Sequence, residues 1–106
     1  MGCWSPVGGK PDWLEGLEAA VRREVREEIG VEIHLERLLV VCDHIVAAEN
    51  QHWVAPIYLA RIVRGEPRNL EPDAIEALGW FTRAMLPTAL TLTSRVALEA
   101  YWQFEP

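Results

Sequence analysis

The chain has 106 residues, half of them hydrophobic and a quarter charged, which suits one globular domain over residues 1–106 with a modest core. Its formal net charge of −6 argues against a nucleic-acid partner, because binding that polyanion requires a basic surface. No apolar run approaches the roughly 18 residues of a membrane span, and no basic-then-apolar leader is present. Two cysteines, Cys3 and Cys42, favour reduced thiols and a cytoplasmic location.

The first strong pattern along the chain is an amphipathic helix that ends at Ile29. A turn-rich loop, Gly8–Asp12, precedes it, and Gly30 follows it as a C-cap that accepts a left-handed backbone. Three arginines are expected to face water on the far side: Arg22, Arg23 and Arg26. Apolar residues recur at spacings of three and four and predict one buried stripe: Leu17, Ala20, Val21, Val25 and Ile29.

Three carboxylates of this helix, Glu24, Glu27 and Glu28, are spaced i, i+3 and i+4, so they point to the same side. Like charges at these positions are unfavourable by roughly 0.2–0.5 kcal/mol per pair unless a cation lies between them. Hard divalent cations such as Mg²⁺ prefer oxygen ligands of this kind. The alternative is an ordinary surface helix, which is the commoner meaning of a charge run by itself.

The second half of the chain predicts strands and one more helix. Residues 33–47 are rich in β-branched and apolar side chains and predict a strand, broken near Glu36 and Arg37. A polar turn at 49–51 leads to a second strand over 52–63, where Pro56 favours an edge or a bulge. Residues 64–69 form a loop by composition, and 79–82 predict a short strand. Thr93 or Ser94 caps a last helix that runs to about residue 104.

The segment from Gly9 to Val31 fits the pattern G-x5-E-x7-R-E-U-x-E-E-x-G-U at all nine defined positions, where U is aliphatic. A chance match of this length is very improbable, and the sequence resembles a Nudix hydrolase. Softer motifs around Trp53, Gly65–Pro67, Asn69–Asp73 and Trp80 resemble the MutT-like branch that cleaves nucleoside triphosphates. The resemblance implies an α/β (α+β) fold, an α/β/α sandwich around a mixed sheet with the two helices on opposite faces.

The resemblance also implies roles for the helix residues. Glu27 and Glu28 would bind Mg²⁺, with Mn²⁺ as a substitute, and Glu24 would be the third ligand or the general base. The backbone carbonyl of Gly8 or its neighbour Gly9 would complete the metal site. Arg23 would orient the glutamates with Glu15 as its partner, and a plain ion pair of little energetic value is the alternative.

Other residues are assigned more loosely from the same resemblance. Glu76 is the first choice for a further metal-binding carboxylate, ahead of Glu71 and Asp73, and a solvated acidic loop is the alternative. Lys10 is a candidate phosphate contact, although an ordinary exposed lysine is favoured. Trp53 and Trp80 are candidates for stacking on the base, although packing in the core is favoured.

The family usually places two strands ahead of the Gly-Gly loop, whereas only Met1–Val7 stands there. We therefore expect an N-terminally shortened form, either a fragment or a natural short protein, with an exposed sheet edge. An unpaired edge favours pairing with another chain, so a homodimer is expected.

Three functions remain open from the sequence. The first is a Mg²⁺-dependent enzyme that converts a nucleoside triphosphate, a modified one, or another nucleoside diphosphate derivative to the monophosphate. The second is a catalytically weak or inactive nucleotide-binding or regulatory domain of the same fold. The third is a structural module whose acidic helix is incidental. The intact motif places the enzyme first, with a small nucleotide as its substrate and neither nucleic acid nor membrane as a partner.

Overall fold

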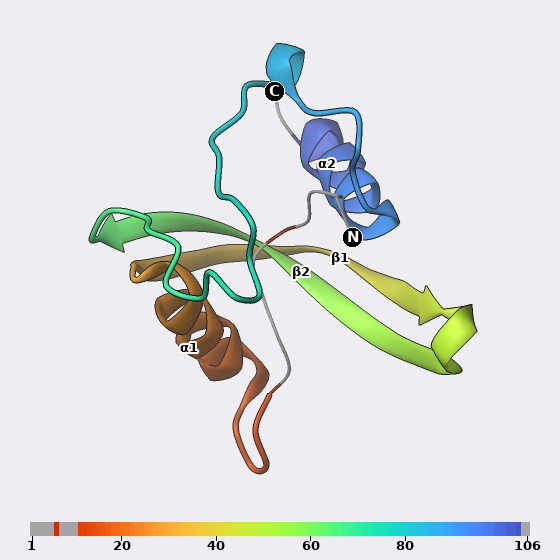
Figure 1. Ribbon diagram of the computed structural model, residues 1–106, viewed down its shortest axis with the longest axis horizontal. Coiled ribbons are helices and arrows are strands. Elements are labelled where there is room, and N and C mark those ends of the chain that lie inside the picture. Colours follow the sequence, from red (N-terminus) through yellow and green to blue (C-terminus); the bar gives the residue numbers. More distant parts are fainter. Residues whose placement is uncertain (1–5, 7–10, 105–106) are drawn as a thin grey trace. The chain divides into compact units, whose positions relative to one another are not determined.

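The structure is a computed structural model that describes residue 6 and residues 11–104. Its elements follow in the order α1 (Leu17–Ile29), β1 (Glu32–Val46), the 3₁₀ turn η1 (Ala47–Glu49), β2 (Gln51–Arg64), the 3₁₀ turn η2 (Arg83–Met85) and α2 (Leu92–Phe104) (Figure 1). The α/β class predicted from the sequence is confirmed. Neither helix of this part of the chain is long and apolar enough to cross a membrane.

The chain forms two compact units, each of which combines segments that are distant in sequence. One unit joins Glu36–Leu59 with the C-terminal segment that begins at Pro87, and it contains α2. The other joins the segment that ends at Leu35 with Ala60–Leu86, and it contains α1. The single-domain boundaries and the placement of the two helices on opposite faces of the sheet stay predictions.

The two strands form a hairpin whose sheet has the order β1-β2 (Figure 1). The predicted strands are confirmed to within a residue or two, and β1 is continuous through Glu36 and Arg37, where a break was expected. The turn consists of η1 followed by Asn50, which has a φ of 52°. Asparagine tolerates this left-handed conformation better than most residues, which explains its position in the turn. Within residues 11–104, the sheet consists of this one antiparallel pair, and Leu90 adds a single β-bridge.

Helix α1 buries an apolar stripe that begins at Ala20 and continues to its last residue. Ala20, Val25 and Ile29 are buried, as the apolar stripe predicts, but Leu17 is 44% exposed. Leu17 is the first residue of the helix, whereas the core of this unit lies at the opposite end, so its assignment to the buried stripe is wrong. Gly30 has a φ of 74° and donates its N–H to the carbonyl of Arg26 at 2.9 Å, which confirms the predicted C-cap.

The core of the unit that contains α1 joins the end of the helix to the base of the hairpin. Val31 is 1% exposed, and full burial of an aliphatic side chain contributes about 1.5–3 kcal/mol. This core therefore fixes which face of α1 packs against the hairpin, and with it the directions of the glutamates around the helix axis. The core consists of three buried residues and three partly buried ones packed against them: Val25, Ile29, Val31, Val21, Ile33 and Ile62.

Two backbone hydrogen bonds attach the loop after β2 to the end of α1. The N–H of Arg68 donates to the carbonyl of Ile29, and the N–H of Leu70 donates to the carbonyl of Glu28, both at 2.9 Å. These carbonyls belong to the last helical turn, where the helix itself provides no donor. The side chain of Asn69 then closes the loop by donating to the carbonyl of Ile75 at 2.6 Å.

The short strand predicted at 79–82 is wrong. The segment has no regular structure and leads into η2. Its apolar residues suggested a strand, but a four-residue segment needs a neighbouring strand to form a ladder. In the part of the chain that the structure describes, the sheet contains β1 and β2 alone.

The cap of α2 is also different from the prediction. Thr91, the residue before the helix, accepts a hydrogen bond from the N–H of Ser94 at 3.1 Å, and the two hydroxyl oxygens are 2.9 Å apart. This is the geometry of an N-cap with its partner three positions later. Ser94 is 5% exposed, because it is the buried partner and not the cap.

Candidate active site

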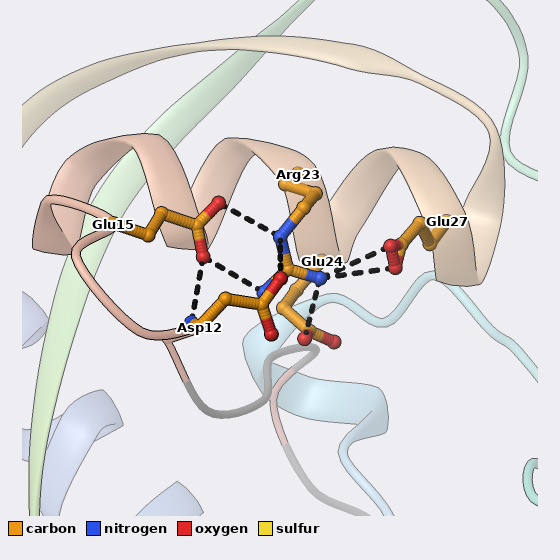
Figure 2. Close-up of polar contacts among 5 residues, drawn as sticks. All are labelled: Asp12, Glu15, Arg23, Glu24 and Glu27. Carbon is orange, nitrogen blue, oxygen red and sulfur yellow. Dashed lines mark hydrogen bonds and ion pairs between the residues drawn. The ribbon is translucent and has the colours of Figure 1, made fainter.

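Arg23 lies at the centre of the candidate site, surrounded by four carboxylates (Figure 2). We call these five residues the Arg23 cluster: Asp12, Glu15, Arg23, Glu24 and Glu27. Helix α1 supplies the arginine and two glutamates, and the loop before it supplies the other two carboxylates. The expectation that Arg23 faces water is wrong, since its side chain is 23% exposed. Arg23 and Glu27 are four residues apart on α1, so their side chains lie side by side and form an ion pair.

The guanidinium of Arg23 divides its contacts between two groups of carboxylates. Nε and Nη2 bind the two oxygens of Glu15 at 2.8 and 2.9 Å, a two-pronged pairing that fixes the plane of the guanidinium. Nη1 lies 2.9 Å from Glu24 and 3.0 Å from both oxygens of Glu27. The loop carboxylate therefore anchors the arginine, and the arginine in turn holds the two helix glutamates. The predicted pairing of Arg23 with Glu15 is present.

Asp12 belongs to this cluster and was not anticipated from the sequence. Its Oδ2 atom lies 3.5 Å from Nε of Arg23, and its backbone N–H donates to Oε1 of Glu15 at 2.9 Å. The N–H of Glu15 donates in turn to the carbonyl of Asp12 at 3.0 Å, so residues 12–15 form a closed turn. The available signal was the three-residue spacing between Asp12 and Glu15, which permits a reciprocal turn of this kind.

The cluster shifts the pKa of its two central groups in opposite directions. The hydrogen bonds from Arg23, and next the N–H of Asp12, lower the pKa of Glu15 from its ordinary value. The hydrogen bonds to Glu15, then to Glu27, raise the pKa of Arg23. Each partner therefore stabilises the charged form of the other.

A pH dependence of stability follows from the lowered pKa of Glu15. Because its folded-state pKa lies below its unfolded value of about 4.3, the ionised carboxylate stabilises the fold above that pH. The contribution is lost as the pH falls through the lower folded-state pKa. We expect Glu15→Gln to flatten the fall in unfolding free energy between about pH 6 and about pH 3, as measured by urea unfolding.

Glu18→Gln is the control for that measurement, because Glu18 is an exposed glutamate of the same helix whose nearest cation is Arg22 at 4.0 Å. It should keep the pH dependence of the wild type. An unchanged slope in Glu15→Gln would contradict the role assigned to the pairing with Arg23.

Leu14 has a backbone conformation that leucine rarely adopts. Its φ is +66°, in the left-handed region that favours glycine, and the conformation costs a residue with a side chain roughly 1–2 kcal/mol. Replacing leucine by glycine removes this strain. The greater conformational freedom of glycine in the unfolded chain lowers the resulting gain in stability by about 0.4–1 kcal/mol. We expect Leu14→Gly to raise the unfolding free energy by about 0.5–1 kcal/mol in chemical denaturation.

The matched control is Asn50→Gly, since Asn50 has a φ of 52° in the hairpin turn but tolerates it. That variant should be nearly neutral. A destabilised Leu14→Gly protein would show that the side chain of Leu14 contributes more than its backbone strain costs.

The predicted metal ligands are hard oxygen donors on one face of α1, which fits Mg²⁺ chemically. Glu24 and Glu27 lie in the Arg23 cluster, whose four carboxylates and one guanidinium leave a formal charge of −3 that attracts a cation. Glu28, half-buried, follows Glu27 and accepts the N–H of Leu70 at its backbone carbonyl. Within the described ranges, no three acidic, histidine or cysteine side chains are gathered closely enough to enclose a metal ion. In this arrangement the carboxylates of Glu24 and Glu27 point toward the guanidinium of Arg23.

The remaining predicted site residues lie elsewhere. Gly8 and Lys10 are outside the described residues. Glu76 is exposed at the end of the loop that Asn69 closes, and its role as a metal ligand stays a prediction. Trp80 is 80% exposed, so the favoured alternative of core packing is wrong for it, and its stacking on the base stays a prediction. Trp53 is half-buried on β2 in the other unit, and its contact with substrate stays a prediction.

The chain matches known proteins along nearly its whole length. The family profile described as NUDIX domain matches residues 2–101. A crystal structure of a MutT NUDIX hydrolase from Burkholderia pseudomallei superposes with a TM-score of 0.83 at 58% sequence identity, covering 93% of this chain and 77% of that one. This agreement confirms the Nudix-type fold class.

Curated relatives are more distant. The chain is 29% identical to the NAD-capped RNA hydrolase ndx-9 of Caenorhabditis elegans over 87% of its length. It is 30% identical to the mitochondrial NAD(P)H pyrophosphatase NUDT13 of Mus musculus over 92% of its length, and 32% identical to the 8-oxo-dGDP phosphatase NUDT18 of Homo sapiens over 84%. It covers 24%, 27% and 27% of these three proteins, about a quarter of each. With the motif, the Arg23 cluster and these matches together, the chain belongs to the NUDIX domain family and is similar to hydrolases of the MutT type.

Proposed function

We propose that the protein is a Mg²⁺-dependent pyrophosphatase that converts a nucleoside triphosphate, or a modified one, to the monophosphate and pyrophosphate. The observation that carries this proposal is the Arg23 cluster, in which one arginine holds Glu24 and Glu27 on the same face of α1. Nudix hydrolases act on small nucleotides and generally use a divalent metal, typically Mg²⁺. The names of the curated relatives indicate different nucleotides, so they support the class of substrate and not one member of it.

The reaction requires water to approach a phosphorus atom surrounded by negative oxygens. Water forms the new P–O bond, the pyrophosphate oxygen leaves with the electrons of the broken bond, and a base takes the proton of the water. When bound, the divalent ion neutralises the phosphate charge and lowers the pKa of water. Glu27 and Glu28 would hold the ion, and Glu24 is either the third ligand or the group that takes the proton.

Arg23 acts on this chemistry through the glutamates. Its guanidinium is fixed on one side by Glu15, so the position of Nη1, and with it the carboxylates of Glu24 and Glu27, is set by the loop before the helix. Catalytic groups must be held to within a fraction of an ångström of their productive positions, and a rigid arginine with a two-pronged anchor meets that requirement. Arg23 is therefore a positioning residue in this proposal.

The test is to incubate the purified protein with Mg²⁺ and separate panels of dNTPs, 8-oxo-dNTPs, NADH and ADP-ribose, from neutral to moderately alkaline pH. Anion-exchange chromatography should show a nucleoside monophosphate and pyrophosphate from at least one triphosphate, and chelation of the metal should abolish both. Release of inorganic phosphate from the triphosphates in place of pyrophosphate would overturn the proposed reaction. Binding without any product would favour a nucleotide-binding domain. The homodimer and the cytoplasmic location stay predictions.

A further inference from the structure

The two residues between Asp12 and Glu15 form an exposed apolar tip on the loop of the Arg23 cluster. Trp13 is 90% exposed and Leu14 is 86% exposed, the highest fractions among the large apolar side chains of residues 11–104. We call this pair the Trp13–Leu14 tip. Single exposed apolar residues are common on proteins, whereas two adjacent ones beside a functional site indicate a surface that binds something.

The tip has a fixed conformation. The turn beneath it is closed by two hydrogen bonds between Asp12 and Glu15, at 3.0 and 2.9 Å, and both of these residues contact Arg23. Leu14 has a φ of +66°, although glycine would adopt that conformation without strain. Strained residues that the surrounding structure holds in place occur preferentially at binding and catalytic sites. The strain and the exposure of the two side chains are thus independent observations about the same tip.

The loop that carries the tip contacts Arg23, which also contacts two carboxylates that the proposed function assigns to the metal. The first and last Cα atoms of a four-residue turn are within about 7 Å of each other, so the tip cannot be far from Asp12 or Glu15. Arg23, which contacts both of them, also contacts Glu24 and Glu27 at 2.9 and 3.0 Å. When the phosphates of a nucleotide lie at these glutamates, the nucleoside, which is covalently attached to the phosphates, must lie nearby. A nucleotide that extends from the glutamates toward this loop would bring its nucleoside to the tip.

We infer that the Trp13–Leu14 tip contacts the nucleoside of the substrate, with Trp13 stacked on the base and Leu14 packed against it. This inference rests on the proposed function. An indole ring is a suitable partner because every base presents a flat π-face, and stacking of this kind tolerates different bases. A second protein molecule fits less well, since a stable interface buries about 800 Å² per partner and the tip has only two side chains.

The kinetic test compares nucleotides with a triphosphate that has no base. Trp13→Ala should raise KM for nucleoside triphosphates by about 10-fold, with a smaller change in kcat, while Trp13→Phe should remain near the wild type. Neither variant should alter the kinetics on methyl triphosphate. Met85→Ala is the matched control, because Met85 is 72% exposed but lies outside the loop, and it should not alter KM. An unchanged KM in Trp13→Ala, or an equal rise with methyl triphosphate, would overturn the inference.

A binding measurement separates this inference from the proposed reaction. Protein labelled with 5-fluorotryptophan gives a ¹⁹F signal for Trp13, assigned by its disappearance in Trp13→Phe. With Mg²⁺ present, a non-hydrolysable nucleoside triphosphate should shift this signal and inorganic triphosphate should not. An equal shift with both ligands, no shift with either, or a shift that depends on protein concentration alone would overturn the inference. If the nucleotide shifts the signal but no product forms in any assay, the proposed reaction fails and the base contact stands.

Discussion

Glu27→Gln is expected to lower kcat by about 10²–10⁴-fold, the range for loss of a group that handles a proton or a catalytic metal. The substitution removes one negative charge from the face where Glu24 and Glu28 also lie, while the amide keeps the size of the side chain. Because the amide oxygen can still accept a hydrogen bond from Nη1 of Arg23, which binds Glu27 at 3.0 Å, the fold should be retained. Initial rates at saturating nucleotide and Mg²⁺ measure the loss.

The same variant has a readout that does not depend on turnover. A cation that binds the folded protein raises its melting temperature, and the rise should become smaller in Glu27→Gln than in the wild type. Glu18→Gln is the control, since Glu18 is an exposed glutamate of α1 that pairs with Arg22 at 4.0 Å. It should retain wild-type activity and the full thermal response to Mg²⁺. If Glu27→Gln retained full activity, the carboxylate of Glu27 would not be required for the reaction.

Arg23→Lys is expected to lower kcat by about 10–100-fold, the typical cost of removing a group that orients metal ligands. Lysine keeps the charge but has one nitrogen, so it cannot bind both oxygens of Glu15 and reach Glu24 and Glu27 at the same time. KM should change less than kcat, because Arg23 acts through the glutamates. The pKa of Glu15 should rise toward its ordinary value, which carboxyl-detected NMR titration measures.

Arg22→Lys is the control for this substitution, because the neighbouring Arg22 is 44% exposed and has one weak contact with Glu18. It should leave kcat and the titration of Glu15 unchanged. If Arg23→Lys also leaves kcat unchanged, the geometry of the cluster is dispensable and a single positive charge is sufficient.

The local sequence pattern correctly predicted the helix that carries the site residues and the hairpin on which this helix packs. The spacing of Ala20, Val25 and Ile29 defines the buried face of α1, and Gly30 ends the helix as expected. Once that face is fixed, helical geometry sets the directions of Glu24, Glu27 and Glu28 around the helix axis. The hairpin was predictable for the same reason, since alternating β-branched runs and a polar turn are local signals.

The errors concern features that depend on contacts distant in sequence. Residues 79–82 have the composition of a strand, but strand formation depends on a partner that the local sequence does not specify. Asp12 joins the Arg23 cluster because the loop folds back along α1, which the sequence does not reveal. Leu17 has the right spacing for the buried stripe, yet the core lies at the other end of the helix, so periodicity alone overestimated its burial.

The two backbone hydrogen bonds that attach the loop after β2 to the end of α1 restrict how the sequence of that loop can change. Positions 68 and 70 must each supply a main-chain N–H to the helix, whichever side chains they carry. Proline lacks this hydrogen and is excluded from both positions, although the same loop contains Pro67 and Pro72. A loop transplanted from a homologue should therefore have a residue other than proline at the positions that correspond to 68 and 70.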